Sequence, residues 1–177
     1  MPTFAVTAIG ADRPGIVAAV TRVLVERGAN LEDCSMSILG GQFAMVMMVA
    51  APEDDGAGRL EAALAAGVAD LDLVVSVREL TAGAAVESPG APYTVVVYGA
   101  DKPGIVHRVT AALAVLRVNI VDLTTRVTGE APAVYTMVIE VTVPDALDPE
   151  VLGDRLAEVA AELGVEVALH PSDADIF

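Results

Sequence analysis

Two kinds of hydrophobic pattern follow one another along the first half of the chain. Residues 3–9 alternate between apolar side chains and small or polar ones, which predicts a strand with one face on a core. From residue 16 to residue 24 the apolar positions recur every three or four residues, which predicts a helix with one apolar stripe that stops at Gly28. The same patterns predict strands at 30–39 and 43–49 joined by a turn at Gly40-Gly41, a shorter helix at 60–67 and a strand at 71–80.

The second half of the chain repeats the first. Residues 10–17 read GADRPGIV and residues 99–106, 89 positions later, read GADKPGIV; the same offset aligns Asn30 with Asn119 without a gap. A repeat of about 90 residues is too long for a solenoid and close to the size of a small domain. We therefore expect the same order of elements again: strands at 93–98, 119–128, 135–143 and 165–169, with helices at 103–116 and 149–163.

The order of elements in each half indicates the fold class. Strand, helix, strand, strand, helix, strand is a βαββαβ unit, which places two helices on one face of a four-stranded antiparallel sheet, as in ferredoxin-like folds. The sequence thus predicts an α+β protein with two ferredoxin-like domains in tandem, at 1–80 and 93–170. Residues 81–92, with two prolines and two glycines, are expected to form a linker, and 171–177 an acidic tail.

Charge excludes one class of partner. The net charge is −15, and acidic residues outnumber basic ones in both halves, 12 to 5 in residues 1–90 and 13 to 5 in residues 91–177. Binding to a nucleic acid backbone requires clustered Lys and Arg, whereas this chain has one lysine, Lys102. We therefore expect no direct binding to nucleic acid.

Hydrophobicity and cysteine content bear on the compartment. Apolar residues make up 54% of the chain, but no apolar run reaches the roughly 18 residues of a membrane span, and no secretory leader is recognisable at the N-terminus. A cytoplasmic protein is expected. The single cysteine, Cys34, suits a reducing compartment and is expected to be a buried, unreactive thiol.

Some apolar residues are not needed for the core between helices and sheet. Val134, Val138 and Met48 are of this kind, so we expect apolar sheet surface to be covered by domain pairing or by a second chain, which indicates a homo-oligomer. The methionines Met36, Met45, Met47 and Met48 are expected to fill the core or the sheet faces.

The repeated motif combines helix-start residues with groups that can bind a ligand. Pro14 suits a first helical turn, and Asp12, two residues earlier, can help to cap it. Equally, amides at a helix N-terminus favour an anion such as an α-carboxylate, glycine lets the backbone come close, and Asp and Asn can accept hydrogen bonds from an ammonium group. The residues alone leave both interpretations open.

Each half of the chain resembles the ACT domain, a small-molecule-sensing regulatory module. The resemblance lies in a first strand, the motif Gly-x-Asp-Arg/Lys-Pro-Gly-Ile-Val, a helix, and Asn-Leu or Asn-Ile at the start of the next strand. The tandem arrangement is similar to the glycine cleavage system transcriptional repressor family. This resemblance implies a small amino acid of the glycine or serine class, bound between paired domains near the loop after the first strand and the start of the second. Residue by residue, it points to Asp12, Pro14, Gly15, Asn30, Asp101, Pro103, Gly104 and Asn119.

Three functional hypotheses follow. The first is an amino-acid-responsive regulator that acts through a protein partner, including transcriptional regulation of amino-acid metabolism. The second is the detached regulatory region of a metabolic enzyme such as phosphoserine phosphatase, and the third is an interaction module that senses nothing. The sequence shows no Ser/His/Asp constellation, phosphate loop or metal-ligand cluster, and Asp173-Ala174-Asp175 is interpreted as part of the acidic tail, so we predict neither catalysis nor a cofactor.

Two histidines remain. His107 stands where the first copy has Ala18; it is expected to be an exposed helical residue, with a place in a site of one half as the alternative. His170 has no partner at metal-ligand spacing, so a zinc site is not predicted.

Overall fold

The computed structural model describes residues 1–81, 89–129 and 133–172 of the chain. The chain divides into two compact units, Met1–Ala85 and Val86–Phe177. Most of the expected linker and residues 173–177 of the expected tail lie outside the described residues. No helix in the described part of the chain is both long and apolar enough to cross a membrane.

The first unit has the predicted order of elements. It contains β1 (Thr3–Ala11), α1 (Ile16–Glu26), β2 (Asn30–Leu39), β3 (Gln42–Ala50), α2 (Ala57–Gly67) and β4 (Leu73–Glu79), with short 3-10 helices at Glu53–Asp55 and Ala69–Leu71. Gly40 and Gly41 form the tight β2–β3 turn with φ angles of 59° and 77°, which glycine adopts without steric cost. The last strand begins later than residue 71, because a 3-10 turn and the left-handed Asp72 precede it.

The second unit repeats the order with β5 (Gly90–Ala100), α3 (Ile105–Val115), β6 (Asn119–Thr128), β7 (Val134–Pro144), α4 (Pro149–Leu163) and β8 (Val165–Pro171). Sequence signals at both ends of α4 predicted its limits. The Asp148 carboxylate accepts a hydrogen bond from the Glu150 amide at 2.9 Å, and Gly164 ends the helix with a φ of 64°.

The expected linker end at residue 92 is wrong, because β5 already begins at Gly90 and its pairing with β7 extends to Pro144. The composition of residues 81–92, with two prolines and two glycines, predicts a linker, and Pro92 cannot donate to a ladder. The pairing between β5 and β8 stops at Tyr93, however, and the carbonyl of Pro92 accepts a hydrogen bond from the Ser172 amide at 3.0 Å.

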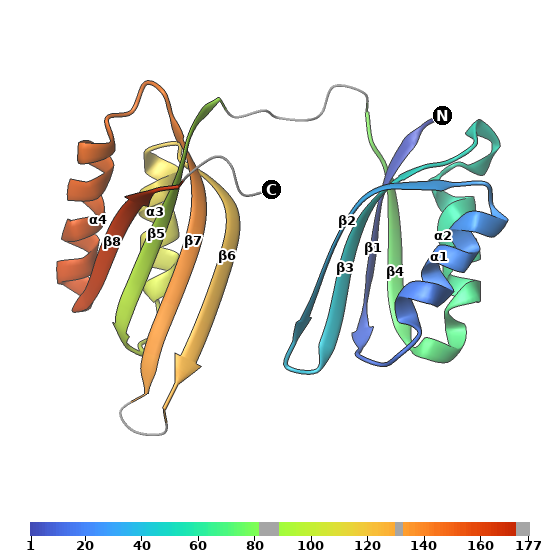
Figure 1. The fold of residues 1–177 in the computed structure, drawn as a ribbon, viewed down its shortest axis with the longest axis horizontal. Helices are drawn as coiled ribbons and strands as arrows, with labels where there is room; N and C mark the ends of the chain where they lie inside the picture. Colours follow the sequence, from blue (N-terminus) through green and yellow to red (C-terminus); the bar gives the residue numbers. More distant parts are fainter. Residues whose placement is uncertain (82–88, 130–132, 173–177) are drawn as a thin grey trace. The chain divides into compact units, whose positions relative to one another are not determined.

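Each unit is a four-stranded antiparallel sheet, in the order β2-β3-β1-β4 in the first and β6-β7-β5-β8 in the second. The two helices of each unit lie on one face of its sheet (Figure 1). Their apolar stripes pack on alternate residues of the two central strands, so Val6 and Met47 in the first unit and Val97 and Met137 in the second are almost fully buried. The prediction of two ferredoxin-like α+β domains is confirmed.

The edge strand β2 corrects one prediction. Cys34 pairs with Met47 and Met36 pairs with Met45, so both side chains face the side of the sheet that carries the helices. Met45 and Met47 are buried, but Cys34 is exposed and Met36 is 48% exposed. The expected buried thiol is therefore wrong: the core under the helices is built from the inner strands and extends over β2 only as far as the half-buried Leu31.

The opposite face of each sheet carries no helix and keeps apolar residues at the surface. Val46 and Met48 of β3 are 48% and 36% exposed, and Val138 of β7 is 36% exposed. Along each strand these residues alternate with buried ones, so their side chains point to the face without helices, as their sequence pattern predicted. Val134 is half-buried.

Candidate functional site

Close approach of backbones explains the first glycine of the repeated motif. A Cβ on Gly10 would lie 2.6 Å from Leu73 Cδ2 and 2.7 Å from the Asp72 carbonyl oxygen. A Cβ on Gly99 would lie 2.8 Å from Val165 Cγ1. Both glycines therefore serve the pairing of the first strand of a unit with its last strand.

The basic residue of the motif has a structural partner in both units. Lys102 Nζ donates a hydrogen bond to the Leu163 carbonyl at 3.0 Å, in the last turn of α4. Arg13 Nη1 reaches the Asp70 carbonyl at 3.4 Å, in the turn after α2. Carbonyls at the end of a helix lack intrahelical donors and carry a partial negative charge, so Lys102 ties its loop to the end of α4. Arg13 ties its loop to the 3-10 turn that follows α2.

The last glycine of the motif requires a left-handed backbone. Gly15 and Gly104 have φ angles of 97° and 94°, and a Cβ would meet nothing within 4 Å at either position. The conformation alone thus selects glycine. Both glycines occupy the N-cap position of their helices, and neither helix start has a side-chain cap. The interpretation of Asp12 as a helix cap is therefore wrong, because the Pro-Gly turn places glycine at the N-cap, and Asp101 does not cap α3 either.

The aspartate of the motif is left without a structural role among the described residues. Asp12 and Asp101 are exposed, and their carboxylates make no hydrogen bond or ion pair to any described side chain or backbone group. The Asp12 amide, by contrast, donates to the Gly41 carbonyl at 2.9 Å. The loop backbone is held in place, while the carboxylate remains available to solvent or a ligand.

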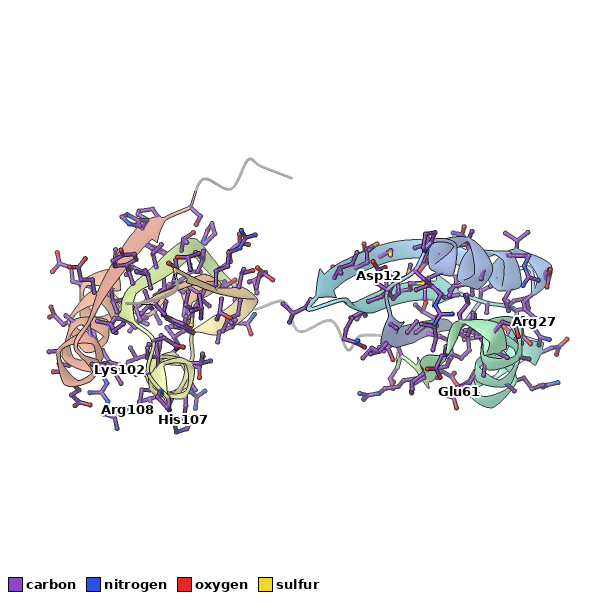
Figure 2. All side chains as sticks on the ribbon, turned by 90° about the horizontal axis from the view of Figure 1, so that it is seen from below. Asp12, Arg27, Glu61, Lys102, His107 and Arg108 are labelled. Carbon is purple, nitrogen blue, oxygen red and sulfur yellow. The ribbon has the colours of Figure 1, made fainter. Side chains whose placement is uncertain are left out.

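A cavity of about 370 Å³ lies against this loop in the second unit, within the range typical of small-molecule sites. It is lined by Asp101, Lys102, Gly104, Ile105, Val106, His107 and Tyr135. Figure 2 labels Lys102 and His107 on the side of this unit where α3 begins. Because α3 has no side-chain cap, its first amides are available to an anion in the cavity.

His107 and Tyr135 stand out in this lining. His107 is exposed in the first turn of α3, as predicted, and it also lines the cavity. Tyr135 comes from β7, where it pairs with Gly99 and is only 7% exposed. Burial, and to a lesser degree the negative charge of Asp101, raises the pKa of Tyr135 above its ordinary value. The phenol therefore stays neutral and remains a hydrogen-bond donor.

The structure does not bring all of the predicted residues together. Asp101 follows Ala100, which pairs with Val134, whereas Asn119 pairs with Thr142 at the other end of β7. Eight residues at about 3.4 Å each put these ends roughly 27 Å apart. Asn30 is separated from the Asp12 loop in the same way. The prediction that loop and asparagine converge is wrong within one domain. β1 and β2 are both antiparallel to β3 and therefore begin at the same end of the sheet, whereas the loop follows the other end of β1.

A second, smaller cavity of about 270 Å³ lies in the first unit and is lined by Glu26, Arg27, Pro52, Asp54 and Asp55. Its best-defined contact is between Arg27 Nε and Asp55 Oδ2 at 2.8 Å, and a second guanidinium nitrogen of Arg27 also contacts the same carboxylate. Among the described residues no group of three or more His, Cys, Asp or Glu could hold a metal ion. Arg27 and Asp55 therefore line this cavity as a structural ion pair, and we assign it no ligand.

The fold and the loops define a tandem pair of ferredoxin-like domains with a ligand-sized cavity at a helix start of the second. The ACT domain family matches the chain twice, over residues 3–78 and residues 93–161. The chain belongs to the ACT domain family.

Two curated relatives match part of the chain. The chain is 34% identical over 121 residues to the glycine cleavage system transcriptional repressor of Escherichia coli K12, a match that spans 68% of this chain and 63% of that protein. It is also 58% identical over 50 residues to a UPF0237 protein of Methanopyrus kandleri. That match spans 28% of this chain and 56% of the UPF0237 protein.

Two solved structures match almost the whole chain. A protein of unknown function from Galdieria sulphuraria has a TM-score of 0.83 and 32% identity, with 97% of this chain and 99% of that chain covered. A candidate glycine cleavage system transcriptional repressor has a TM-score of 0.70 at 23% identity, with 96% of each chain covered, and shows the shared fold.

Proposed function

We propose that this tandem ACT protein is a regulatory protein that binds a small amino acid at the loop between the first strand and first helix of a unit. The observation that carries the proposal is the cavity beside Asp101. Packing, cation anchoring and a positive φ explain Gly99, Lys102 and Gly104. Asp101, by contrast, lines a ligand-sized space, and its carboxylate has no hydrogen-bond or ion-pair partner among the described residues.

The chemistry of the cavity suits an α-amino acid. Its α-carboxylate can accept hydrogen bonds from the free amides at the start of α3, where the helix dipole favours negative charge. Its ammonium group can donate to Asp101, and the apolar walls formed by Ile105 and Val106 suit a small side chain. The glycine or serine class implied by the ACT resemblance agrees with this lining.

The test is a thermal-shift screen of the full chain against the amino acids, followed by calorimetry. An amino acid at a hundred times its dissociation constant should raise the unfolding free energy by about 2.7 kcal/mol. The loss of one hydrogen bond is worth about 0.5–3 kcal/mol, so the double variant Asp12→Ala/Asp101→Ala should bind roughly three- to a hundredfold more weakly. Stabilisation by no amino acid, or unchanged affinity in the double variant, would refute the proposal.

Asn30 and Asn119 require their own arm of this test. Because they lie far from the loops of their own domains, neither can contact a ligand at that domain's loop. If Asn119→Ala weakened binding as much as Asp101→Ala, the ligand would have a contact at the opposite end of the sheet. Equal affinity in Asn119→Ala and wild type would confine the site to the loop.

We propose further that the protein is cytoplasmic and acts through a protein partner rather than through DNA, because the net charge of −15 repels a duplex. The named relative from Escherichia coli is a transcriptional repressor, which favours regulation of amino-acid metabolism as the output. Apolar residues such as Val46, on the helix-free sheet face, support a homo-oligomer. Light scattering that gave a strict monomer would contradict the oligomer.

A further inference from the structure

The two units differ at the positions that surround the loop. Tyr135 pairs with Gly99, and the residue that pairs with the corresponding Gly10 is Phe43. His107 of the second unit likewise corresponds to Ala18 of the first. The second unit thus has two polar side chains where the first has a phenyl ring and a methyl group.

The hydroxyl of Tyr135 is poorly satisfied within the protein. Tyr135 is more than nine-tenths buried and lines the cavity, yet the partner of its hydroxyl is the thioether sulfur of Met137, at 3.6 Å. A thioether is a weak acceptor, and buried hydroxyl groups usually find a stronger one. A ligand oxygen in the cavity would supply that acceptor. Burial, and to a lesser degree the negative charge of Asp101, raises the pKa of Tyr135, so the phenol stays in its neutral, donating form.

The helix start adds a second element to this arrangement. The amides of Ile105 and Val106 have no side-chain cap, and these two residues line the cavity together with Asp101. A zwitterion therefore meets donors for its carboxylate and an acceptor for its ammonium, with Tyr135 as a third polar contact from a different element. Phe43 can offer no such contact in the first unit.

We infer that each chain binds one amino acid, in the second unit, and that the Tyr135 hydroxyl is a binding group that donates a hydrogen bond to a carboxylate oxygen of the ligand. This inference rests on the proposed function and adds to it the choice of unit. The first unit then contributes fold and interaction surface without a ligand of its own.

The test is titration calorimetry of the full chain with glycine, alanine and serine, each added separately. For the amino acid that binds, we expect one site per chain and about tenfold weaker binding in Tyr135→Phe, as the loss of a hydrogen bond to a charged group gives. Phe43→Tyr is the matched control, because Met45 stands two residues later as Met137 does after Tyr135, and it should leave affinity unchanged. A melt of Tyr135→Phe checks folding, which we expect to survive since the first unit already holds phenylalanine there.

The outcomes separate the two proposals. One site per chain, weakened by Tyr135→Phe and by Asp101→Ala but not by Asp12→Ala, supports the inference. Two equivalent sites, or equal affinity in Tyr135→Phe and wild type, overturn it and leave amino-acid binding intact. Absence of binding to the wild-type chain in the full amino-acid screen overturns both.

Discussion

Replacing the Arg27–Asp55 ion pair by two leucines should leave the stability of the first unit almost unchanged, although each single replacement destabilises it. Arg27 follows α1 as its C-cap, and Asp55 precedes α2 by two residues. The second unit holds Leu116 and Leu147 at these places, and both pack against its core. The same fold therefore uses an ion pair in one copy and apolar contacts in the other.

The burial of the two partners sets the expected magnitudes. The side chain of Asp55 is 8% exposed and that of Arg27 is 34% exposed. Breaking a buried pair costs about 3–5 kcal/mol, and we expect about 2–3 kcal/mol for Arg27→Leu because water reaches the arginine and screens the pair. Asp55→Leu should cost about 1–2 kcal/mol, since the freed guanidinium can turn to solvent.

The double variant should lie within about 1 kcal/mol of wild type. Replacing a buried ion pair by apolar residues is often neutral or stabilising, while the loss of a cation at the end of α1 costs about 0.3–1 kcal/mol. The two single effects together amount to about 3–5 kcal/mol, so the cycle should give a coupling of roughly 3 kcal/mol.

The assay is urea unfolding followed by far-ultraviolet circular dichroism, because the chain contains no tryptophan. The control is Arg22→Leu/Glu26→Leu, which removes an ion pair of α1 whose side chains are 56% and 58% exposed. That variant should change stability by less than about 0.5 kcal/mol. If the double variant of Arg27 and Asp55 lost as much unfolding free energy as the two single variants together, that result would refute the reasoning. The leucines of the second unit could then not replace the ion pair of the first.

Three further predictions concern single positions or the whole chain. Arg117 has a left-handed φ of 57° where the first unit has Gly28 at 65°, so Arg117→Gly should stabilise by up to about 1 kcal/mol and Gly28→Ala should destabilise by about 1 kcal/mol in urea unfolding. The pKa of Tyr135 is raised in the folded state, so the unfolded phenol ionises first and the free energy of unfolding should fall as the pH rises above about 10. Urea unfolding at about pH 9 to 11 should show a smaller fall in Tyr135→Phe. Finally, the purified protein should show no salt-sensitive binding to duplex DNA in fluorescence anisotropy at about 50 mM salt; tight binding there would contradict the charge argument.

Local signals predicted the elements well because each depends on a few adjacent residues. Asp148-Pro149 and Gly164 set the limits of α4, and Gly40-Gly41 set the β2–β3 turn, as their chemistry requires. The capping role of Asp12 failed for an equally local reason, because the left-handed Gly15 occupies the N-cap instead. The exposure of Cys34 had no local signal: its alternating segment looks like any half-buried strand, and only the sheet order makes β2 an edge.

Tyr135 escaped prediction for a reason that lies in the duplication itself. The gap-free offset of 89 that aligns Asn30 with Asn119 would place Tyr135 opposite Val46, an exposed residue of the helix-free face. The structure pairs Tyr135 with Gly99 and Phe43 with Gly10, so the true offset in this strand is 92. Two residues separate β2 from β3 whereas five separate β6 from β7, and this longer connection accounts for the shift of three. A comparison of the two copies that allowed a gap at the hairpin would have shown tyrosine in place of phenylalanine beside the motif, which is the difference on which the choice of the second unit depends.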